Sequence, residues 1–313
     1  MYIGGSSIWD YLVGKDILKT QHKFDEFLLI LVKFTTMFTS LLLGFKNLFM
    51  ENFKIESQYN IAGISCASGL VYRGNSLFII SDNSSFLYEY HLTEKELTKI
   101  KLFENSQENI PKKDKYDFES IALKDNKLHL FGSGSTPKRE KEITYDLETE
   151  TIEEKNLSKL YKKIKQTTSI SDEDLNIEGV LFNDGKWHLF QRGNGANSRN
   201  GIAILNDNFD DNGTIDFIPI QLPKIKHVET SFTDAILVED KIYFLATAED
   251  TTSTYYDGEI LGSLIGRMNS QTLEIEFTQK ITDIHKFEGL TIYNKTKDKI
   301  EFLLCEDNDS EVL

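Results

Sequence analysis

The segment Glu178-Gly-Val-Leu-Phe-Asn-Asp-Gly-Lys-Trp-His-Leu-Phe190 places two apolar runs on either side of the turn sequence Asn183-Asp-Gly185. Short apolar runs separated by such turn residues are typical of a β-hairpin. Similar segments recur four more times along the chain, beginning at Ser68, Glu119, Thr233 and Glu288. The steps between successive starts are 51, 59, 55 and 55 residues. A repeat of this length favours a propeller over a sandwich, because sandwiches lack a fixed long period.

Most repeats continue with two more short apolar segments. In the third repeat these are Gly201–Leu205 and Thr214–Ile218. Four antiparallel strands in about 50 residues make one propeller blade. The sequence therefore predicts an all-β fold, a five-bladed β-propeller. The alternating segment Phe53–Tyr59 is expected to supply the missing fourth strand of the last blade and so to close the ring. The insertion 156–166 reads as a short helix with Ser158 as its N-cap.

The first 49 residues differ from the rest of the chain. Residues 27–45 form a largely apolar run with a single charge, Lys33. Their length suits a membrane span, and the internal lysine weakens that interpretation. An uncleaved anchor, an amphipathic segment and a wrongly assigned start, with Met50 as the true initiator, all remain open. We expect residues 1–49 to be an extension with an apolar helix and residues 50–313 to form the propeller. Localisation follows this choice: membrane-anchored if residues 27–45 are retained, cytoplasmic if translation starts at Met50.

The chain carries a formal net charge of −15, of which residues 1–49 contribute +1. Such an acidic protein repels phosphate backbones, so we expect no nucleic-acid partner. Two cysteines are too few for a disulfide framework, and no Cys/His cluster has zinc spacing. We expect a monomer without an organic cofactor, whose charge suits cation binding or solubility.

Propeller topology predicts where polar side chains gather. The first strand of a blade runs along the central channel and the second runs back, so the start of one and the end of the other meet at the same end. Carboxylates that converge there repel one another unless protons or a cation neutralise them. Hard oxygen donors of this kind suit Ca²⁺ or Mg²⁺. We predict metal ligands among Glu119, Glu178, Asp234, Glu288 and Asp307.

Other residues at the same end are candidates for binding a small polar ligand or a peptide. Arg192 could pair with Glu178 or Glu288, or hold a carboxylate or phosphate in bidentate fashion. The long polar segment that runs from Thr247 past Asp257 is expected to lie over this end. The predicted ligand-binding residues are Asp82, Ser133, Arg192, Asn194, Glu249, Asp250 and Asp257. If the protein is an enzyme, Glu119, Glu178 and Glu288 are its candidate catalytic groups. The repeated Glu could also be structural, bonding backbone N–H groups of the neighbouring blade.

The segments Asp117-Phe-Glu-Ser-Ile-Ala122, Asn176-Ile-Glu-Gly-Val180 and Lys286-Phe-Glu-Gly-Leu290 resemble the D-x-E-G-[IV]-A signature of SdiA-regulated and esterase-like phytase propellers. A closer resemblance is to an uncharacterised bacterial family of phytase-like propellers. That resemblance spans residues 53–313 and rests on the segments Cys66–Gly69, Ser81–Asn83, Arg192–Asn194 and Ala248–Ser263. It implies a propeller with an acidic end and with calcium, and it brings no defined activity.

Three functions follow as hypotheses. The first is a propeller that binds a divalent cation and a small polar or anionic ligand. The second is a metal-dependent hydrolase, phosphoesterase (phytase-like) or lactonase-like, in which the cation polarises the substrate and a Glu acts as general base. The third is a protein-interaction scaffold that uses the opposite face. Propeller phytases bind phosphates through several Lys and Arg, and Arg192 alone does not match that pattern.

Overall fold

The computed structural model describes residues 52–195, 197, 199–206, 209, 213–251 and 258–307. The predictions for residues 1–49, including the apolar segment 27–45, lie outside these residues. Within the described part of the chain, no helix combines the length and apolar character that a membrane crossing requires.

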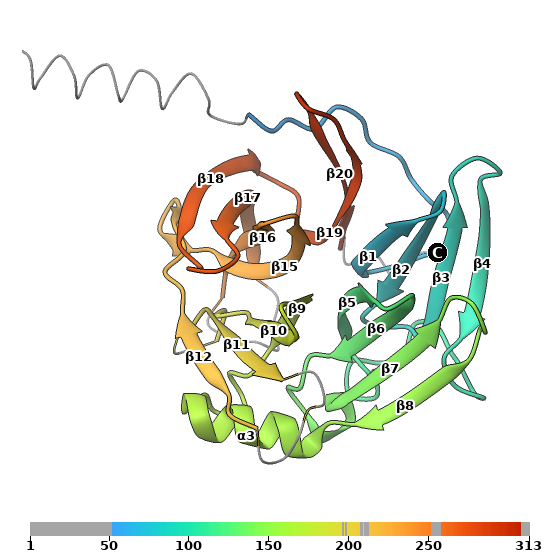
Figure 1. Ribbon diagram of the computed structural model, residues 1–313, viewed down its shortest axis with the longest axis horizontal. Helices are drawn as coiled ribbons and strands as arrows, with labels where there is room; N and C mark the ends of the chain where they lie inside the picture. The colour runs from blue at the N-terminus through green and yellow to red at the C-terminus, as the bar shows by residue number, and fades with distance from the viewer. Residues whose placement is uncertain are drawn as a thin grey trace, which may run out of the picture. The chain divides into compact units, whose positions relative to one another are not determined.

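Four antiparallel sheets of four strands account for most of the structure (Figure 1). The first contains β1 (Ala67–Arg73), β2 (Ser76–Ser81), β3 (Phe86–His91) and β4 (Glu96–Lys101). The second contains β5 (Phe118–Lys124), β6 (Lys127–Gly132), β7 (Lys141–Asp146) and β8 (Ile152–Asn156). The third contains β9 (Ile177–Asn183), β10 (Lys186–Gln191), β11 (Gly201–Asn206) and β12 (Asp216–Pro219). The fourth contains β15 (Ser231–Val238), β16 (Lys241–Asp250), β17 (Glu259–Asn269) and β18 (Ile275–Thr282).

Two small sheets complete the set. β13 (Lys224–Ile225) pairs with β14 (Val228–Glu229), and β19 (Phe287–Lys295) pairs with β20 (Ile300–Glu306). All five predicted hairpins are therefore present, as β1–β2, β5–β6, β9–β10, β15–β16 and β19–β20.

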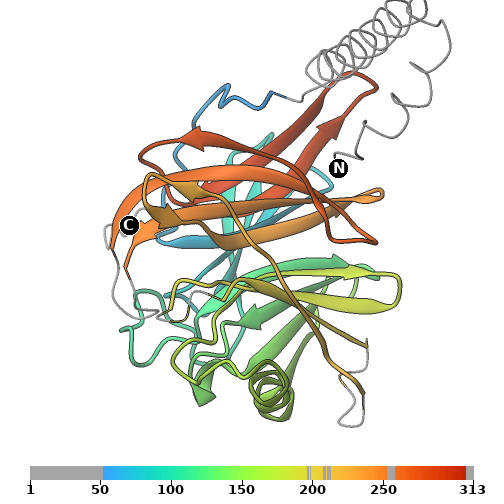
Figure 2. The same ribbon diagram turned by 90° about the vertical axis from the view of Figure 1, so that its left-hand side faces the viewer.

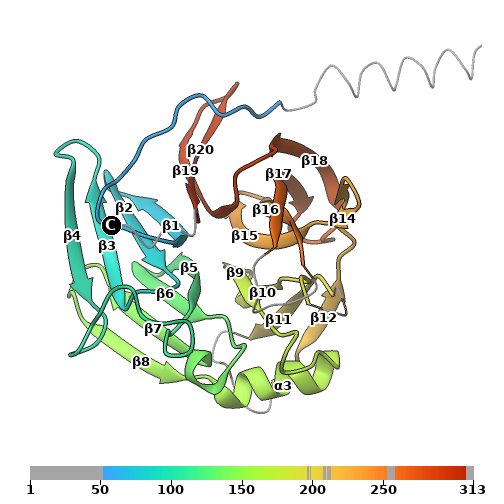
Figure 3. The same ribbon diagram turned by 180° about the vertical axis from the view of Figure 1, so that it is seen from behind.

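The sheets surround a common centre. The first strand of each four-stranded sheet lies innermost and the fourth lies at the periphery (Figures 1 and 3). Each innermost strand contacts those of its neighbours, in the order β1, β5, β9, β15, β19 and back to β1. Apolar clusters fill the spaces between neighbouring sheets. The prediction of an all-β, propeller-like fold is confirmed for four complete blades.

Glycine allows the innermost strands to approach each other closely. A Cβ at Gly289 would lie 2.9 Å from the Cα of Gly69 on β1. A Cβ at Gly179 would lie 3.1 Å from the backbone nitrogen of Ala235 on β15. Each of these glycines directly follows a repeated Glu. The carboxylate therefore lies next to the point where two inner strands come into close contact.

The predicted closing strand at 53–59 is not formed. Residues 52–61 carry no strand, and β20 pairs with β19 alone among the described residues. The reason lies in Phe53. Its backbone N–H donates to the side-chain oxygen of Gln279 at 2.9 Å, and its carbonyl accepts from the same amide. Its ring packs on Phe277 and Phe302, with centroids 5.9 and 5.8 Å away. Phe53 is thus anchored between β18 and β20, and its hydrogen bonds go to a side chain of the fourth blade.

The predicted helix forms as α3 (Ser158–Thr168), after β8 and at the outside of the ring (Figure 2). Its buried face includes Leu160, Tyr161 and Ile164, which pack into the cluster between the second and third blades. The N-cap prediction is wrong by one residue: Leu157 is the N-cap, and Ser158 is the first helical residue. The side chain of Asn156 accepts the N–H of Ser158 at 2.9 Å, so a residue before the cap takes the role expected of Ser158.

Candidate cation site at one end of the ring

One backbone hydrogen bond recurs at the same end of four hairpins. The N–H of the residue after the second strand donates to the carbonyl of a residue just before or at the start of the first strand. The pairs are Asp82 to Cys66 (3.3 Å), Ser133 to Asp117 (2.9 Å), Arg192 to Asn176 (2.8 Å) and Asp307 to Lys286 (3.1 Å). The predicted meeting of strand starts and strand ends is therefore present in these hairpins. We call the end of the ring that holds these pairs the charged end.

Three carboxylates of the first two blades converge at the charged end. Each of Asp82, Asp117 and Glu119 offers an oxygen that lies within 4.8 Å of the others. Asp117 and Glu119 are buried, and the side chain of Asp82 is 18% exposed. We call these residues the acidic trio. Carboxylate oxygens in this arrangement are the donors that Ca²⁺ and Mg²⁺ take in proteins.

Two buried cations reach the trio from connecting segments. Lys115 bonds Asp82 and lies 3.0 Å from the Oδ1 of Asp117. Arg139 donates to the Oδ2 of Asp117 at 2.6 Å, and Ser133 donates to the same oxygen at 2.5 Å. Burial disfavours the ionised form of Asp117, but Lys115 and Arg139 outweigh it, so its pKa lies below the ordinary value of 3.8.

Glu119 has no such partner. No described residue donates a hydrogen bond to its carboxylate, although the residue is only 9% exposed. Burial raises its pKa well above the ordinary 4.5, and Glu178, Asp117, Asp82 and Glu288 raise it further. Asp82 shows the same effect more weakly: burial is the largest cause, and its pKa rises to about 6. One oxygen of Asp82, Oδ1, is buried without a partner. The trio is thus short of positive charge.

A second group of charges at the charged end is built around Arg192. Its Nη1 lies 3.1 Å from Glu178 and 3.6 Å from Glu288, and its Nη2 lies 2.5 Å from Glu249. Both terminal nitrogens are therefore engaged within the protein. Burial opposes the charge of Arg192, but the three carboxylates outweigh it and raise its pKa above the ordinary value. The predicted pairing with Glu178 and Glu288 is present.

Glu249 also fixes the base of the polar segment after β16. Its Oε1 accepts the N–H of Gly258 at 2.7 Å while its Oε2 holds Arg192. One side chain therefore ties Arg192 to the point where the chain returns to β17. Asp257 lies outside the described residues.

Lys286 supplies a further cation. Its Nζ lies 2.8 Å from Glu288 and 3.1 Å from Asp307. Burial raises the pKa of Glu288 to about 8, and Asp307 and Glu178 add to the rise while Lys286 and Arg192 oppose it. Two of the predicted metal ligands, Glu288 and Asp307, are thus already bridged by one lysine.

Asp234 lies in a different environment. Its Oδ1 accepts the N–H of Ala235 at 2.7 Å, and its Oδ2 accepts the N–H of Leu290 at 2.6 Å. Both oxygens bond backbone groups, and one bond crosses from β15 to β19. This is the structural role that was the alternative for the repeated acids. Two hydroxyls make comparable links between inner strands: Ser68 donates to the carbonyl of Phe118 and Thr233 to that of Phe287.

The remaining predicted residues differ in their surroundings. Asn194 lies two residues after Arg192, and its Oδ1 is buried without a partner. Asp250 is exposed at the end of β16, and its carboxylate lies 3.2 Å from the Nε2 of His227. The structure therefore brings together Asp82, Ser133, Arg192, Glu119, Glu178, Glu249, Glu288 and Asp307, but leaves Asp250 at the surface.

Sequence reasoning missed Lys115, Asp117, Arg139 and Lys286 as site residues. A signal existed for two of them. In the third blade the residue two before the repeated Glu is Asn176, which donates to Glu178 at 2.5 Å. Asp117 and Lys286 occupy the equivalent positions before Glu119 and Glu288. Lys115 and Arg139 lie on connections without a repeat equivalent, so no pattern marks them.

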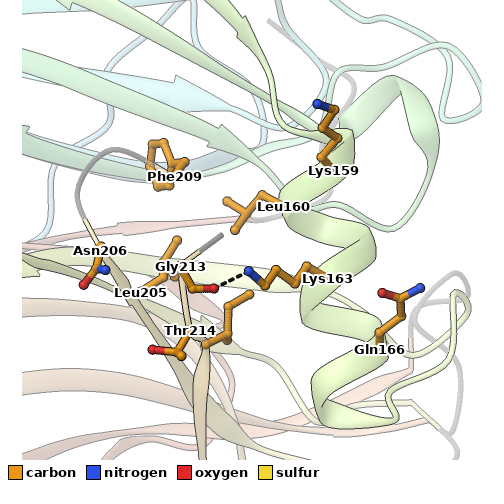
Figure 4. Close-up of a pocket in the computed structure, with 10 residues that line it drawn as sticks. Lys159, Leu160, Lys163, Gln166, Leu205, Asn206, Phe209, Gly213 and Thr214 are labelled. Carbon is orange, nitrogen blue, oxygen red and sulfur yellow. Dashed lines mark hydrogen bonds between the residues drawn. The ribbon is translucent and has the colours of Figure 1, made fainter. Parts of the chain in front are cut away.

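A cavity of about 310 Å³ lies elsewhere, between α3, the end of β11 and residues 213–215, which precede β12 (Figure 4). Apolar side chains such as Leu160 and Phe209 line it together with Lys159 and Lys163. The Nζ of Lys163 bonds the carbonyl of Gly213. No predicted site residue lines this cavity, so the candidate site rests on the charged end.

These features define a β-propeller-like protein with a buried cluster of charges at one end of its inner strands. The chain belongs to the family of unknown function DUF6929, whose sequence model matches residues 63–313. The matched family does not test the resemblance to SdiA-regulated and phytase-like propellers, which stays a prediction. The search of curated proteins found no match.

Among solved structures, the chain is similar to the computationally designed Ika4 protein, with 9% identity and a TM-score of 0.31 over 66% of this chain and 98% of that chain. It is also similar to a structure described as the extracellular domain of the one-component system BT4673 from B. thetaiotaomicron. There the identity is 12% and the TM-score 0.37, over 77% of this chain and 25% of that one. Neither similarity bears on function.

Proposed function

We propose that the protein binds a divalent cation, Ca²⁺ or Mg²⁺, at the acidic trio, and through it a small polar ligand or a peptide at the charged end. The observation that carries this proposal is the state of Glu119. Its carboxylate is buried, receives no hydrogen bond from the described residues and has four other carboxylates as its strongest electrostatic neighbours. Such a group must be neutralised by a proton or by a cation.

The repeat supports this interpretation. In the third blade and in β19–β20, the residue two before the repeated Glu satisfies it: Asn176 donates a hydrogen bond to Glu178, and Lys286 forms an ion pair with Glu288. In the second blade that position holds Asp117, an acid. With an acid in place of a donor at this position, the repeated Glu of the second blade, Glu119, lacks a hydrogen-bond donor and can take part in binding a cation.

The available oxygens favour Ca²⁺. Asp117 uses Oδ2 for Arg139 and Ser133, so Oδ1, which faces Lys115 at 3.0 Å, is the oxygen that a metal would take. Asp82 has a buried oxygen without a partner, and no described residue donates a hydrogen bond to Glu119. A set of monodentate and bidentate carboxylates completed by water fits the flexible shell of Ca²⁺ better than the strict octahedron of Mg²⁺. The resemblance to phytase-like propellers favours the same ion.

The charge balance favours a cationic or neutral partner over a phosphate. Arg192, Lys286, Lys115 and Arg139 each pair with carboxylates of the protein. Capture of an anion by these side chains would break buried ion pairs, which is costly. We therefore expect any anionic group of the ligand to bind the divalent cation and not these side chains.

We also propose that β19–β20 is the inner half of a fifth blade. The ring of innermost strands closes through β19, which contacts both β15 and β1. The hairpin also has the repeat pattern of the other four. Phe53 packs against Phe302 on β20, the outer strand of this hairpin, where further strands of the blade would lie.

Thermal denaturation of the full chain in CaCl₂ and in MgCl₂ tests the cation site. Binding to the folded state alone raises the melting temperature by mass action. We expect Ca²⁺ to raise it for the wild-type chain and for the surface control Glu276→Gln. Glu119→Gln should remove the shift. An unchanged melting temperature at millimolar Ca²⁺ and Mg²⁺ in the wild type would reject the proposal and favour the interaction scaffold.

A further inference from the structure

Lys115 occupies the side of the acidic trio that a metal would use. Its ammonium group bonds Asp82 and lies 3.0 Å from the Oδ1 of Asp117. The other oxygen of Asp117 is held by Arg139 at 2.6 Å. The oxygen that faces Lys115 is therefore the one left for a metal. The side chain of Lys115 is 10% exposed, so bulk water does not screen this contact.

The backbone around Lys115 is held in place by hydrogen bonds and by ring stacking. Residues 111–115 form a turn in which the N–H groups of Asp114 and Lys115 donate to the carbonyl of Pro111, at 2.7 and 3.1 Å. The next residue, Tyr116, stacks on Phe103 with ring centroids 4.4 Å apart. The ammonium group sits at the end of a flexible four-carbon chain. Displacement of the ammonium group from the trio would require rotation of this side chain and not movement of the turn.

We infer that Lys115 is a built-in competitor for the metal, a tethered cation that a divalent ion must displace from Asp82 and Asp117. This inference rests on the proposed function. An ammonium group and a metal ion cannot both bridge the same two oxygens, and a lysine that stayed nearby would repel the ion. The lysine keeps the trio stable when the metal is scarce and raises the concentration at which the metal binds.

The same contact gives selectivity by charge. Exchange of one ammonium for Na⁺ or K⁺ brings no additional positive charge to the trio. Exchange for a divalent ion brings one more, which can neutralise Glu119, the carboxylate that Lys115 does not bond. Binding is therefore expected for divalent and not for monovalent ions.

Lys286 provides a matched control. It is also buried and also bridges two carboxylates, Glu288 and Asp307. Those residues lie outside the trio, and Glu288 keeps Arg192 as a second cation 3.6 Å away. Loss of Lys286 removes the same charge from the same end of the ring without freeing the trio.

Calorimetric titration of the full chain with CaCl₂ tests the inference. Removal of a competing charge beside a divalent ion is expected to tighten Ca²⁺ binding about tenfold or more in Lys115→Met. Lys286→Met should tighten it by less than about threefold, since its charge acts from outside the trio. Equal affinity of the wild type and Lys115→Met would overturn the inference and leave the cation site standing. Weaker binding in Lys115→Met would also overturn it, because Lys115 would then support the site.

A second measurement uses the wild-type chain and does not depend on the folding of a variant. An amine-reactive ester labels exposed lysines, and mass spectrometry reads each one. Saturating Ca²⁺ should increase labelling of Lys115 and leave Lys286 unchanged, while NaCl at equal ionic strength should change neither. If Ca²⁺ stabilises the chain but Lys115 stays protected, displacement is rejected. If Ca²⁺ neither stabilises nor binds, the cation site fails and the inference with it.

Discussion

Asp117 and Glu119, two residues apart at the start of β5, hold carboxylate oxygens within 4.8 Å of each other. The equivalent pair in the third blade, Asn176 and Glu178, is a donor and an acceptor 2.5 Å apart. The same position in the repeat thus serves two purposes. A donor there satisfies the Glu, and an acid there creates a group that needs a cation from outside the repeat.

Replacement of Glu119 by Gln should stabilise the protein when no divalent cation is present. At a pH above the ordinary pKa of a glutamate, the folded chain must either keep a proton on Glu119 or hold its negative charge among other carboxylates. Both lower the stability of the folded state, and Gln avoids both. We expect the variant to be more stable than the wild type at pH 8 and little different from it at pH 4, because the pKa of Glu119 is raised by burial. Urea denaturation in the presence of a chelator measures this. Equal stability of the variant and wild type at pH 8 would show that Glu119 carries no penalty.

Stability without divalent cations should fall as the pH rises from about 5 to 8. The pKa of Glu288 is about 8 in the folded protein against an ordinary 4.5, and that of Asp82 is about 6 against 3.8. At a pH between the pKa of such a carboxyl in the unfolded chain and its pKa in the folded chain, the folded state holds a proton that the unfolded state has lost. Each rise in pH across this range therefore lowers the free energy of unfolding, and the loss is complete above the pKa in the folded chain. Burial lowers the pKa of His188, which acts in the opposite direction below about pH 6.5.

Comparison of variants separates these contributions. Glu288→Gln should flatten the decline between pH 6.5 and 8, where His188 no longer contributes, by about 2 kcal/mol. The measurement is the free energy of unfolding in urea across a pH series. A decline of the same steepness in Glu288→Gln would contradict the assignment.

Asp234 should prove structural. Replacement by Ala removes acceptors from two buried N–H groups, those of Ala235 and Leu290, and unties β15 from β19. We expect a loss of about 2–4 kcal/mol in the free energy of unfolding. The cation-induced increase in melting temperature should remain. Loss of that increase with stability unchanged would instead place Asp234 among the metal ligands, as the sequence suggested.

The repeat made most of the fold predictable. Five hairpins, several third and fourth strands and α3 follow from local patterns of apolar residues and turns. The fate of Phe53 could not be predicted from its alternating neighbours, since it depends on Gln279, 226 residues away. The site divides in the same way. The repeat places Glu119, Glu178 and Glu288, but Lys115 and Arg139 arrive on connections whose course no local pattern encodes.

Arg192 should be the most sensitive residue at the charged end. Arg192→Met leaves Glu178, Glu249 and Glu288 without their shared cation in a buried environment. Removal of one partner from a buried ion pair costs about 3–5 kcal/mol, whereas the partly exposed control Arg267→Met, which loses a pair with Glu276, should cost less than about 1 kcal/mol.

Addition of Glu249→Gln to Arg192→Met should recover part of that loss, because one of the stranded charges is then gone. The double-mutant cycle, measured by urea denaturation, isolates the coupling of Arg192 to Glu249. The expected coupling exceeds 1 kcal/mol because both side chains are buried and 2.5 Å apart. Independent effects of the two substitutions would mean that the ion pair with Glu249 contributes nothing, and that Arg192 acts through Glu178, Glu288 or packing.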